Sequence, residues 1–366
     1  MWIIILVSVG CLSGFFLFKK HTLPLDPELE PYRGNMKLSV IIPARNEACN
    51  LPHLLQSLQS QTVPPYEIIV VDDFSEDRTK EIAESYGVKV IAGSTLPSGW
   101  TGKSWAVWNG YLNATGDAFA FLDADIRLAP HALDALLKAR ERAGGVVSVV
   151  PFHHTEKGYE KLALVMNVLG IFAFTSKFER TNPQKGLYGS CILALREDYE
   201  RINGHASVRT EVLDDLLIGS KFIEAGIAVT NFIGYDLVSF RMYPQGIQSE
   251  IEGFSKGAIL STSRLSPWTI IPIAIWVVGL LVSEAVFFAI GTSWFIPLLA
   301  GYLLYMLQFI YFKKYVGKFG LVIPVLHVIA ALFFIAVMLY SAYQFVFLGH
   351  VRWKGRKIRV GGRREQ

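Results

Sequence analysis

The sequence predicts an α/β domain with a mixed, mostly parallel sheet, flanked by N-terminal and C-terminal transmembrane helices. Three observations support this prediction. From residue 37, short β-branched runs alternate with amphipathic stretches, which is typical of βα units. Residues 2–18 form an uncharged apolar run, and residues 268–347 are mostly apolar. A hydrophobic fraction of 52% with a mean hydropathy of +0.36 is too high for a purely soluble enzyme.

The net charge of +4 describes the C-terminus rather than the whole chain. Residues 350–366 contain seven Lys or Arg and one Glu, a local charge of +6, so the rest of the chain carries −2. The central part has no basic face with interleaved aromatic residues, which argues against nucleic-acid binding. The three cysteines, Cys11, Cys49 and Cys191, have no CxxC or CxxH spacing and indicate neither a disulfide framework nor a zinc site.

Residues 1–20 are expected to form a membrane anchor. A signal peptide is the alternative, but only Met1 precedes the apolar run and no cleavage site of small residues follows it. Four basic residues come next, and the positive-inside rule then places the following domain in the cytoplasm of a multi-pass cell-membrane protein. They are Lys19, Lys20, Arg33 and Lys37. Residues 21–36 are expected to be a linker.

Residues 37–240 are expected to form the α/β domain. The predicted strands are Leu38–Ile42, Glu67–Val71, Val88–Ala92, Ala118–Leu122 and Val146–Val150. The predicted helices are 47–60, 77–86, 103–114 and 130–142. Ligands of such sheets collect at the carboxyl ends of the strands, and the polar clusters of this sequence lie at those ends.

Two polar clusters follow the first two predicted strands. The first is Pro43-Ala-Arg45-Asn46-Glu47, and the second begins with Asp72-Asp73 and continues to Thr79. Asn46, Ser75 and Asp77 have a structural explanation as helix caps. The functional alternative is that the two corners hold a base and a ribose by hydrogen bonds.

A third cluster contains Lys103, in Gly99-Trp-Thr-Gly-Lys103-Ser-Trp-Ala. The Gly-Lys-Ser triplet is not a P-loop, because residue 97 is Pro and no strand leads directly into the loop. A lysine at a helix N-terminus is well placed to meet a phosphate. The alternative is a surface lysine beside two packed tryptophans.

The fourth cluster is Asp123-Ala124-Asp125, after an apolar strand. Strand residues i and i+2 point the same way, so Asp123 and Asp125 are expected to share a face and to repel each other unless a cation or a cationic partner lies between them. Oxygen ligands of this kind suit Mg2+ or Mn2+ carried on a diphosphate. The alternative is a helix-capping Asp followed by a second Asp in a turn.

Four further features precede residue 241. The apolar stretch 159–178 is a buried helix, a membrane-surface helix or a span, and residues 187–194 are expected to form a strand. Asn203-Gly204-His205 is expected to be a tight turn. Asp214-Asp215 opens an amphipathic helix, where acidic residues also favour the helix dipole. His153, His154 and His205 lack metal-binding spacing and are interpreted as ordinary polar residues.

Residues 241–267 are expected to form an interfacial amphipathic segment, 268–348 transmembrane helices, and 349–366 a basic tail. The predicted spans are 268–290, 294–312 and 319–347, and Glu284 is expected to face another helix or the headgroups. Four spans in total would put the basic tail opposite the cytoplasmic domain, against the positive-inside rule. We therefore expect one segment to be re-entrant or interfacial, since 319–347 is overlong and contains Pro324; an exported tail is the alternative.

Taken in order, these clusters resemble the family 2 glycosyltransferases of the GT-A fold over residues 37–240. The ordered set is Pro43–Glu47, Asp72-Asp73, Lys103, Asp123-Ala-Asp125 and Asp214-Asp215. The flanking spans, the Trp-Thr-Gly-Lys-Ser-Trp-Ala segment and Trp353-Lys-Gly-Arg resemble the membrane-bound branch that acts on lipids. Within that branch the likeness is greatest to carotenoid-acid (4,4'-diaponeurosporenoate-type) glycosyltransferases, followed by hopanoid-associated and ceramide glucosyltransferase-like members.

The resemblance implies a hexose transfer, with inversion, from a UDP-sugar to a lipid acceptor. Asp215 would be the general base, with Asp214 in place of the family's usual Glu, and Asp123 and Asp125 would bind ribose and the metal, Mg2+ or Mn2+. The donor nucleotide-sugar site would comprise Pro43, Arg45, Asn46, Glu47, Asp72, Asp73, Lys103, Asp123, Ala124 and Asp125. Acceptor-side candidates are Gly189, His205, Arg241 and Tyr243.

One departure from the family pattern bears on the acceptor. The Gln-x-x-Arg-Trp motif of processive and ceramide-type members is absent, and Glu252-Gly-Phe254-Ser-Lys256 takes roughly its place. This argues against polymer synthesis.

Three alternatives to hexose transfer to a carotenoid acid stay open. The first is transfer to a hopanoid, sphingolipid or polyprenyl phosphate. The second is a nucleotidyl- or phosphosugar-transferring enzyme on a similar fold, and the third is a non-catalytic membrane scaffold.

Overall fold

The computed structural model describes residues 2–24, 32, 34–93, 95–211, 213–258, 262, 264–353 and 356–359. The chain forms two compact units. The sheet unit comprises His21–Phe152 and Pro183–Met242, and the helical unit comprises Met1–Lys20, His153–Asn182 and Tyr243–Gln366. Much of the predicted linker and the end of the basic tail lie outside the described residues.

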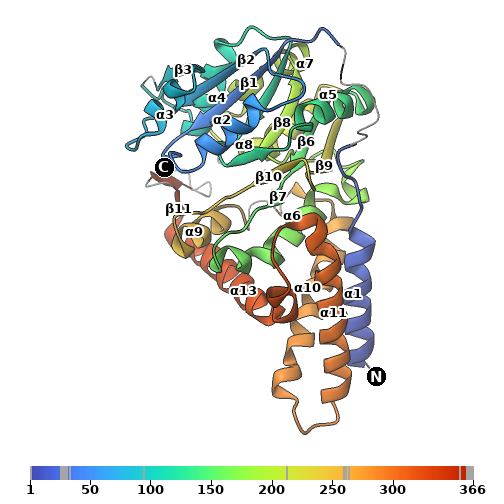
Figure 1. Ribbon diagram of the computed structural model, residues 1–366. Helices are drawn as coiled ribbons and strands as arrows, with labels where there is room; N and C mark the ends of the chain where they lie inside the picture. The colour runs from blue at the N-terminus through green and yellow to red at the C-terminus, as the bar shows by residue number, and fades with distance from the viewer. Residues whose placement is uncertain are drawn as a thin grey trace, which may run out of the picture. The chain divides into compact units, whose positions relative to one another are not determined.

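The sheet unit is built on a seven-stranded sheet of order β3-β2-β1-β4-β8-β6-β9 (Figure 1). Its strands are β1 (Leu38–Ala44), β2 (Glu67–Asp72), β3 (Lys89–Ala92), β4 (Ala118–Leu122), β6 (Val146–Val150), β8 (Cys191–Leu195) and β9 (Val229–Ile233). Strand β8 is antiparallel to β4 and β6, whereas the other neighbouring pairs are parallel. The predicted mixed, mostly parallel sheet is confirmed.

Helices cover both faces of this sheet because alternate strand residues face opposite sides. Val40 and Ile42 of β1 pack in one core with helices α2 (Leu51–Gln59), α3 (Thr79–Ser85) and α5 (Ala132–Ala143). Ile41 packs in the other core, which includes α4 (Gly102–Leu112), α7 (Arg196–Arg201) and α8 (Asp214–Glu224). The central strands are therefore buried on both faces, which explains their continuous apolar runs.

Strand β1 is the topological switch point of the sheet. The chain passes from β1 to β2 and β3 on one side, and β4 lies on the other side of β1. Ligands of open α/β sheets bind at such a point, at the carboxyl ends of the strands. A short antiparallel pair, β5 (Ile126–Leu128) and β10 (Val238–Phe240), follows directly after the β4 end.

Two predicted elements begin four residues later than expected. The strand predicted at 187–194 is observed as β8, which begins only at Cys191, so residues 187–190 are not part of it. The helix predicted at 47–60 begins at Leu51, after a turn in which Asn50 N and Leu51 N both donate to the Glu47 carbonyl. The predicted turn at Asn203-Gly204 is confirmed, with φ values of 59° and 44° before the short 3-10 helix η3 (Gly204–Val208).

Among the described residues of the helical unit, three segments are long and apolar enough to cross a membrane. They are Pro267–Phe288, Phe295–Val316 and His327–Leu348, of 22 residues each. They include helices α10 (Pro267–Glu284), α11 (Phe295–Val316) and α13 (His327–Tyr343). The N-terminal helix α1 (Trp2–Leu17) has 16 residues. At 1.5 Å per residue it is shorter than the roughly 30 Å hydrocarbon core.

The stretch predicted as one helix at 319–347 is broken. A four-residue helix α12 (Val322–Val325) contains Pro324 and ends at Leu326, before α13 begins at His327. The prediction of a single helix is therefore wrong, because proline removes a backbone donor near the break. The apolar stretch 159–178 contains η1 (Tyr159–Ala163) and α6 (Leu164–Thr175), and the 12 residues of α6 are too few for a span.

Several polar groups within the apolar helices are paired with one another, although the buried atoms Thr269 Oγ1 and Glu284 Oε2 have no hydrogen-bond partner among the described residues. The Glu284 Oε1 atom lies 2.6 Å from Nδ1 of the buried His327, so Glu284 faces another helix, as predicted. Trp276 Nε1 donates to Gln308 Oε1 at 2.7 Å, and Gln308 Nε2 donates to the carbonyl of Cys11 at 2.7 Å. These bonds connect α10, α11 and α1, as interhelical polar contacts do in apolar surroundings.

Glu250 is a buried carboxyl group on helix α9 (Ile247–Ala258). Its exposed fraction is 0%, and neither carboxyl oxygen has a hydrogen-bond partner among the described residues. Burial, followed by the charge of Glu160 on η1, raises the pKa of Glu250 from 4.5 to about 8. The folded protein therefore binds a proton that the unfolded chain releases between these two pH values.

Stability should accordingly fall as the pH rises from about 4.5 to 8. The expected loss in the free energy of unfolding is up to about 1.4 kcal/mol per pH unit. Glu250→Gln should remove much of this loss, measured by thermal unfolding of the detergent-solubilised protein at pH 5, 7 and 9. Glu252→Gln, on the same helix and bonded to Gln248 at its surface, is the matched control. Equal pH dependence in the wild type and Glu250→Gln would contradict the assignment.

Candidate active site

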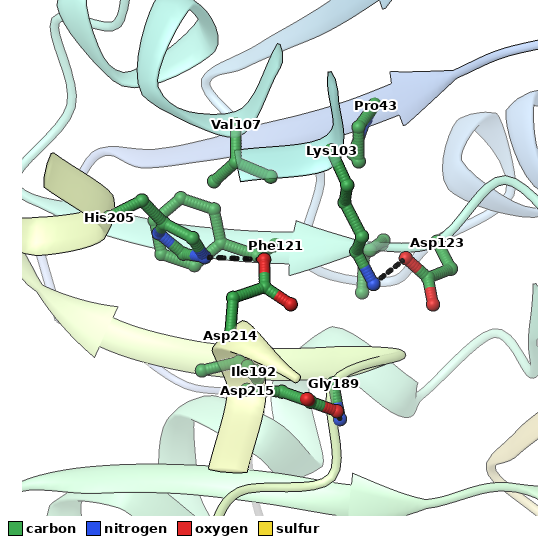
Figure 2. A pocket seen from close by; sticks show the side chains of 11 residues that line it. Pro43, Lys103, Val107, Phe121, Asp123, Gly189, Ile192, His205, Asp214 and Asp215 are labelled. Carbon is green, nitrogen blue, oxygen red and sulfur yellow. Dashed lines mark hydrogen bonds and ion pairs between the residues drawn. The ribbon is translucent and has the colours of Figure 1, made fainter. Parts of the chain in front are cut away.

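A pocket in the sheet unit brings together side chains from six separate segments of the chain. Figure 2 shows Lys103, Asp123, Asp214 and Asp215 pointing into the same space. The lining residues are Pro43, Lys103, Val107, Phe121, Leu122, Asp123, Gly189, Ile192, His205, Asp214 and Asp215. Pro43 lies in β1 and Asp123 directly follows β4, so the pocket lies at the predicted carboxyl edge of the sheet.

The Lys103 ammonium is the cation of this pocket. It lies at the start of α4, and its Nζ atom is 2.8 Å from Asp123 Oδ1. Burial acts to lower the pKa of Lys103, but Asp123, Asp214 and Asp215 oppose it and hold the pKa above its ordinary value. Lys103 therefore stays charged. Its side chain is 41% exposed, which leaves the ammonium accessible to an anionic ligand.

Asp214 is buried and held by neutral groups. Its Oδ2 atom accepts a hydrogen bond of 3.0 Å from Ser104 Oγ, which in turn accepts one of 2.8 Å from Thr101 Oγ1, the N-cap of α4. His205 Nε2 lies 4.0 Å from the same Asp214 oxygen. These contacts fix the orientation of Asp214 at the start of α8.

His205 is neutral at physiological pH. Burial lowers the pKa of His205 to about 4, although Asp214 opposes this shift. The Tyr199 hydroxyl accepts from the His205 backbone N–H at 3.0 Å and lies 2.8 Å from His205 Nδ1. The hydroxyl proton is then available to Nδ1, which assigns the ring proton to Nε2, facing Asp214.

Asp215 is held differently. Its Oδ2 atom accepts a hydrogen bond of 3.1 Å from the Gly189 backbone N–H, and Oδ1 accepts one of 3.1 Å from Leu216 N. A Cβ atom at Gly189 would lie 2.5 Å from Asp215 Oδ2, so only glycine permits this approach. Asp215 is less buried than Asp214 and lines the pocket with its carboxylate.

Asp123, Ala124 and Asp125 form the turn between β4 and β5. Strand β4 ends at Leu122, and Ile126 N donates to the Asp123 carbonyl at 3.1 Å. The shared strand face expected for the two carboxylates is therefore wrong, because the strand does not extend through them. Asp123 lines the pocket, whereas Asp125 and the buried Ala124 do not. The Asp125 carbonyl accepts from Arg241 N at 3.1 Å.

The corners after β1 and β2 bind each other. Asn46 N donates to Ser75 Oγ at 3.0 Å, and Asn46 Oδ1 accepts from Glu76 N at 2.8 Å. Glu47 N donates to Thr79 Oγ1 at 2.8 Å, and the Arg45 guanidinium donates to the Asp73 carbonyl at 3.2 Å. The cap interpretation of Asn46 is thus replaced by a bridge between two loops. Asp72 and Asp73 are both buried at this corner.

The structure therefore separates the predicted residues into groups. Pro43, Lys103, Asp123, Gly189, His205, Asp214 and Asp215 share the pocket. Arg45, Asn46, Glu47, Asp72 and Asp73 form the adjacent corner at the same sheet edge, where Ala44 pairs with Asp72. Arg241 binds the Asp125 backbone, and Tyr243 belongs to the helical unit.

Two side chains at the site, those of Ser104 and Tyr188, were not predicted from the sequence. Ser104 supports Asp214, a residue 110 positions away, and no local pattern indicates such a contact. Tyr188 is the second. Burial, followed by the charges of Asp125, Asp215 and Asp123, raises the pKa of Tyr188. Its position next to Gly189 in a predicted strand was the only available signal.

Comparisons with known proteins identify the family. Residues 39–202 match the model of glycosyl transferase family 2. The chain is 34% identical over 368 residues to the 4,4'-diaponeurosporenoate glycosyltransferase of Staphylococcus haemolyticus (strain JCSC1435), covering 96% of each chain. It is 32% identical over 376 residues to the enzyme of the same name from Staphylococcus aureus (strain USA300), covering 98% of this chain and 96% of that one.

A solved structure shows the same fold. The mannosyltransferase of Pyrobaculum calidifontis, determined in complex with GDP-Man and Mn2+, aligns with 94% of this chain and 98% of its own, with a TM-score of 0.53 and 17% sequence identity. The mixed sheet with its pocket at the switch point is accordingly of the GT-A type. The matched domain, the near-full-length relatives and the ordered acidic clusters agree, and the chain belongs to the family 2 glycosyltransferases.

Proposed function

We propose that this glycosyltransferase transfers glucose or another hexose from a UDP-sugar to a carotenoid acid, with inversion at the anomeric carbon. The observation that carries the proposal is the convergence of Lys103 and Asp123 with Asp215 in one pocket. The first pair suits a diphosphate, and the last residue suits an acceptor. The acceptor class is supported by the relatives named 4,4'-diaponeurosporenoate glycosyltransferase.

On the donor side, Lys103 is placed to bind the diphosphate. Its pKa is held above the ordinary value by surrounding carboxylates, so it offers a full positive charge at neutral pH. When the donor binds, a diphosphate oxygen would replace Asp123 as the ion-pair partner of Lys103. The corner formed by Asp72 and Asp73 lies beside β1 at the same edge and would hold the nucleoside.

The residues present also fit a divalent metal bound together with the donor. Among the described residues, no group of three or more His, Cys, Asp or Glu side chains converges to hold a metal. Mg2+ and Mn2+ are commonly held by one or two carboxylates with phosphate oxygens completing the shell. Asp123 and Asp125 would supply these carboxylates, and the metal would stabilise charge on the leaving diphosphate.

On the acceptor side, Asp215 is the better candidate for the general base. Asp214 is buried and already accepts from Ser104, whereas Asp215 faces the pocket and is positioned by Gly189 and Leu216. Asp215 would take the acceptor proton, or orient an acceptor that is already a carboxylate, as its oxygen attacks the anomeric carbon. Asp214 would keep the start of α8 in place.

The three long apolar helices support a membrane location close to a lipid acceptor. The basic residues Lys19, Lys20 and Lys37, which follow α1 in the sequence, favour a cytoplasmic sheet unit in a multi-pass protein. Because α1 has only 16 residues, we infer that it anchors the chain without a full-length span of its own. Three complete C-terminal spans after a cytoplasmic sheet unit would place the basic tail outside, against the charge rule, whereas a re-entrant stretch at 319–347, which is broken after Pro324, would keep it in the cytoplasm.

The proposal is tested by mass spectrometry of lipid extracts from carotenoid-acid-producing cells with and without the gene. The wild type should add one hexose to the pigment. Asp215→Asn should reduce transfer about 100-fold or more if Asp215 takes a proton from the acceptor, and by less if it only orients a carboxylate acceptor. Asn keeps the acceptor for the Gly189 N–H but cannot take a proton. Purified Asp215→Asn should still bind the donor. A hexosylated hopanoid, sphingolipid or polyprenyl phosphate in place of the pigment would identify a different acceptor. Activity of Asp215→Asn within a few-fold of wild type would refute the role of Asp215 as general base.

Asp125→Ala should abolish metal-dependent donor binding. Calorimetric titration of the purified protein with UDP-glucose and with GDP-mannose, each with Mn2+, Mg2+ or a chelator, measures the effect. GDP-mannose is included because the mannosyltransferase of similar fold was crystallised with GDP-Man. Asp236→Ala, which removes an exposed carboxylate of the same unit, should bind as wild type does. An unchanged titration for Asp125→Ala would exclude its role in metal binding.

Gly189→Ala should reduce kcat about 100-fold with little change in donor affinity. The added methyl group would lie 2.5 to 2.9 Å from three atoms of Asp215 and must displace its carboxylate. A shift of about 1 Å at a reacting group costs this much. Gly170→Ala is the control, because a Cβ there meets no atom within 4 Å. Wild-type kcat in Gly189→Ala would show that the position of Asp215 is unimportant.

A further inference from the structure

Phe74 has a backbone conformation that is unfavourable for its side chain. It lies between β2 and α3, and its φ is 55°, in the left-handed region. A bulky residue there is a genuine outlier, whereas glycine adopts the conformation without strain. Such strain persists only where the surroundings impose it, and it is concentrated at functional sites.

The hydrogen bonds of the neighbouring residues impose this backbone conformation on Phe74. The next residue, Ser75, is fixed on both sides, because its hydroxyl accepts from Asn46 N at 3.0 Å and its own N–H lies 3.4 Å from Asp72 Oδ2. Asp73 N donates to the Ala44 carbonyl at 2.8 Å. The backbone of Phe74 is therefore held between two anchored residues and has no freedom to relax.

Burial does not account for the choice of phenylalanine. The Phe74 side chain is 46% exposed, so much of its ring remains in water. A Cβ atom built on Gly93 would lie 3.1 Å from both Phe74 Cδ2 and Phe74 Cε2. One edge of the ring thus packs against Gly93, just after β3, while much of the ring remains exposed.

An unsatisfied acceptor lies at the same corner. Asp72 is 7% exposed, and its Oδ1 atom is buried without a hydrogen-bond partner among the described residues. A buried carboxylate oxygen without a partner is costly, and a ligand N–H or O–H would satisfy it. A fixed aromatic ring beside a carboxylate acceptor suits a flat heterocycle that carries hydrogen-bond donors.

We propose that Phe74 is the stacking platform for the base of the donor nucleotide, with Asp72 Oδ1 accepting a hydrogen bond from the same nucleoside. The inference rests on the proposed function of this sheet edge as a nucleotide-sugar site. Stacking accepts any base, so Phe74 contributes affinity for the nucleotide rather than a choice among bases. The backbone strain is offset by a ring that is already in position before the ligand binds.

The test compares nucleotide and diphosphate binding by the full-length protein in detergent with saturating Mn2+. UDP, GDP and inorganic diphosphate are titrated calorimetrically into the wild type, Phe74→Leu and Phe74→Tyr. Phe74→Leu keeps an apolar side chain but removes the flat ring, so nucleotide binding should weaken about tenfold while diphosphate binding is unchanged. Phe74→Tyr should stay within about twofold of wild type.

Tyr66→Leu is the matched control, because Tyr66 is an exposed aromatic residue, 54% accessible, just before the opposite end of β2. It should bind UDP as the wild type does. Equal weakening of nucleotide and diphosphate in Phe74→Leu would indicate a purely structural ring and overturn the inference, as would unchanged nucleotide binding. A wild type that binds neither nucleotide would overturn the donor site itself, and this inference with it.

Discussion

The site depends on one electrostatic balance, between the Lys103 ammonium and the carboxylates of Asp123, Asp214 and Asp215. These acidic groups come from the β4 turn and the start of α8, and without a cation their mutual repulsion would separate them. Lys103 lies 2.8 Å from Asp123, and the charges of all three carboxylates raise its pKa against the effect of burial. One cation thereby offsets the repulsion among the carboxylates of the pocket before any ligand is present.

The adjacent carboxylates Asp214 and Asp215 have different environments, and this difference separates their roles. Asp214 is buried and receives the hydroxyl of Ser104, with neutral His205 nearby. Asp215 receives only backbone N–H groups in the hydrogen bonds described above and faces the pocket. A carboxylate already engaged by a buried hydroxyl is suited to positioning. One supported by backbone donors and open to the pocket is suited to acting on an acceptor.

In the helical unit, the absence of water around the apolar helices determines how buried polar groups are arranged. Without water in an apolar environment, each buried polar atom needs a partner in the protein. Gln308 therefore joins Trp276 to the Cys11 carbonyl, and Glu284 pairs with His327. Glu250 lies outside these pairs, on α9, and it responds to burial through its protonation state. Its carboxyl oxygens have no hydrogen-bond partner among the described residues, and the raised pKa favours the neutral form instead.

Local patterns were sufficient to predict much of this protein. Strand and helix periodicity located β1, β2, β3, β4 and β6, and the polar residues that end β1, β2 and β4 marked the functional edge, because parallel strands end together. Hydropathy located the long apolar helices. Spacing also indicated Lys103 at a helix start and Asp214-Asp215 at another.

Contacts between distant segments were decided by the tertiary structure alone. The antiparallel insertion of β8 between β4 and β6 brings Gly189 against Asp215, and the packing of α4 near α8 brings Ser104 to Asp214. Neither contact has a periodic signal, since it depends on which elements become neighbours. The positive φ of Phe74 likewise follows from loop anchoring by Asn46 and Ala44. By itself the sequence determined the order of elements and the residue types at their ends; folding decided which of those ends meet.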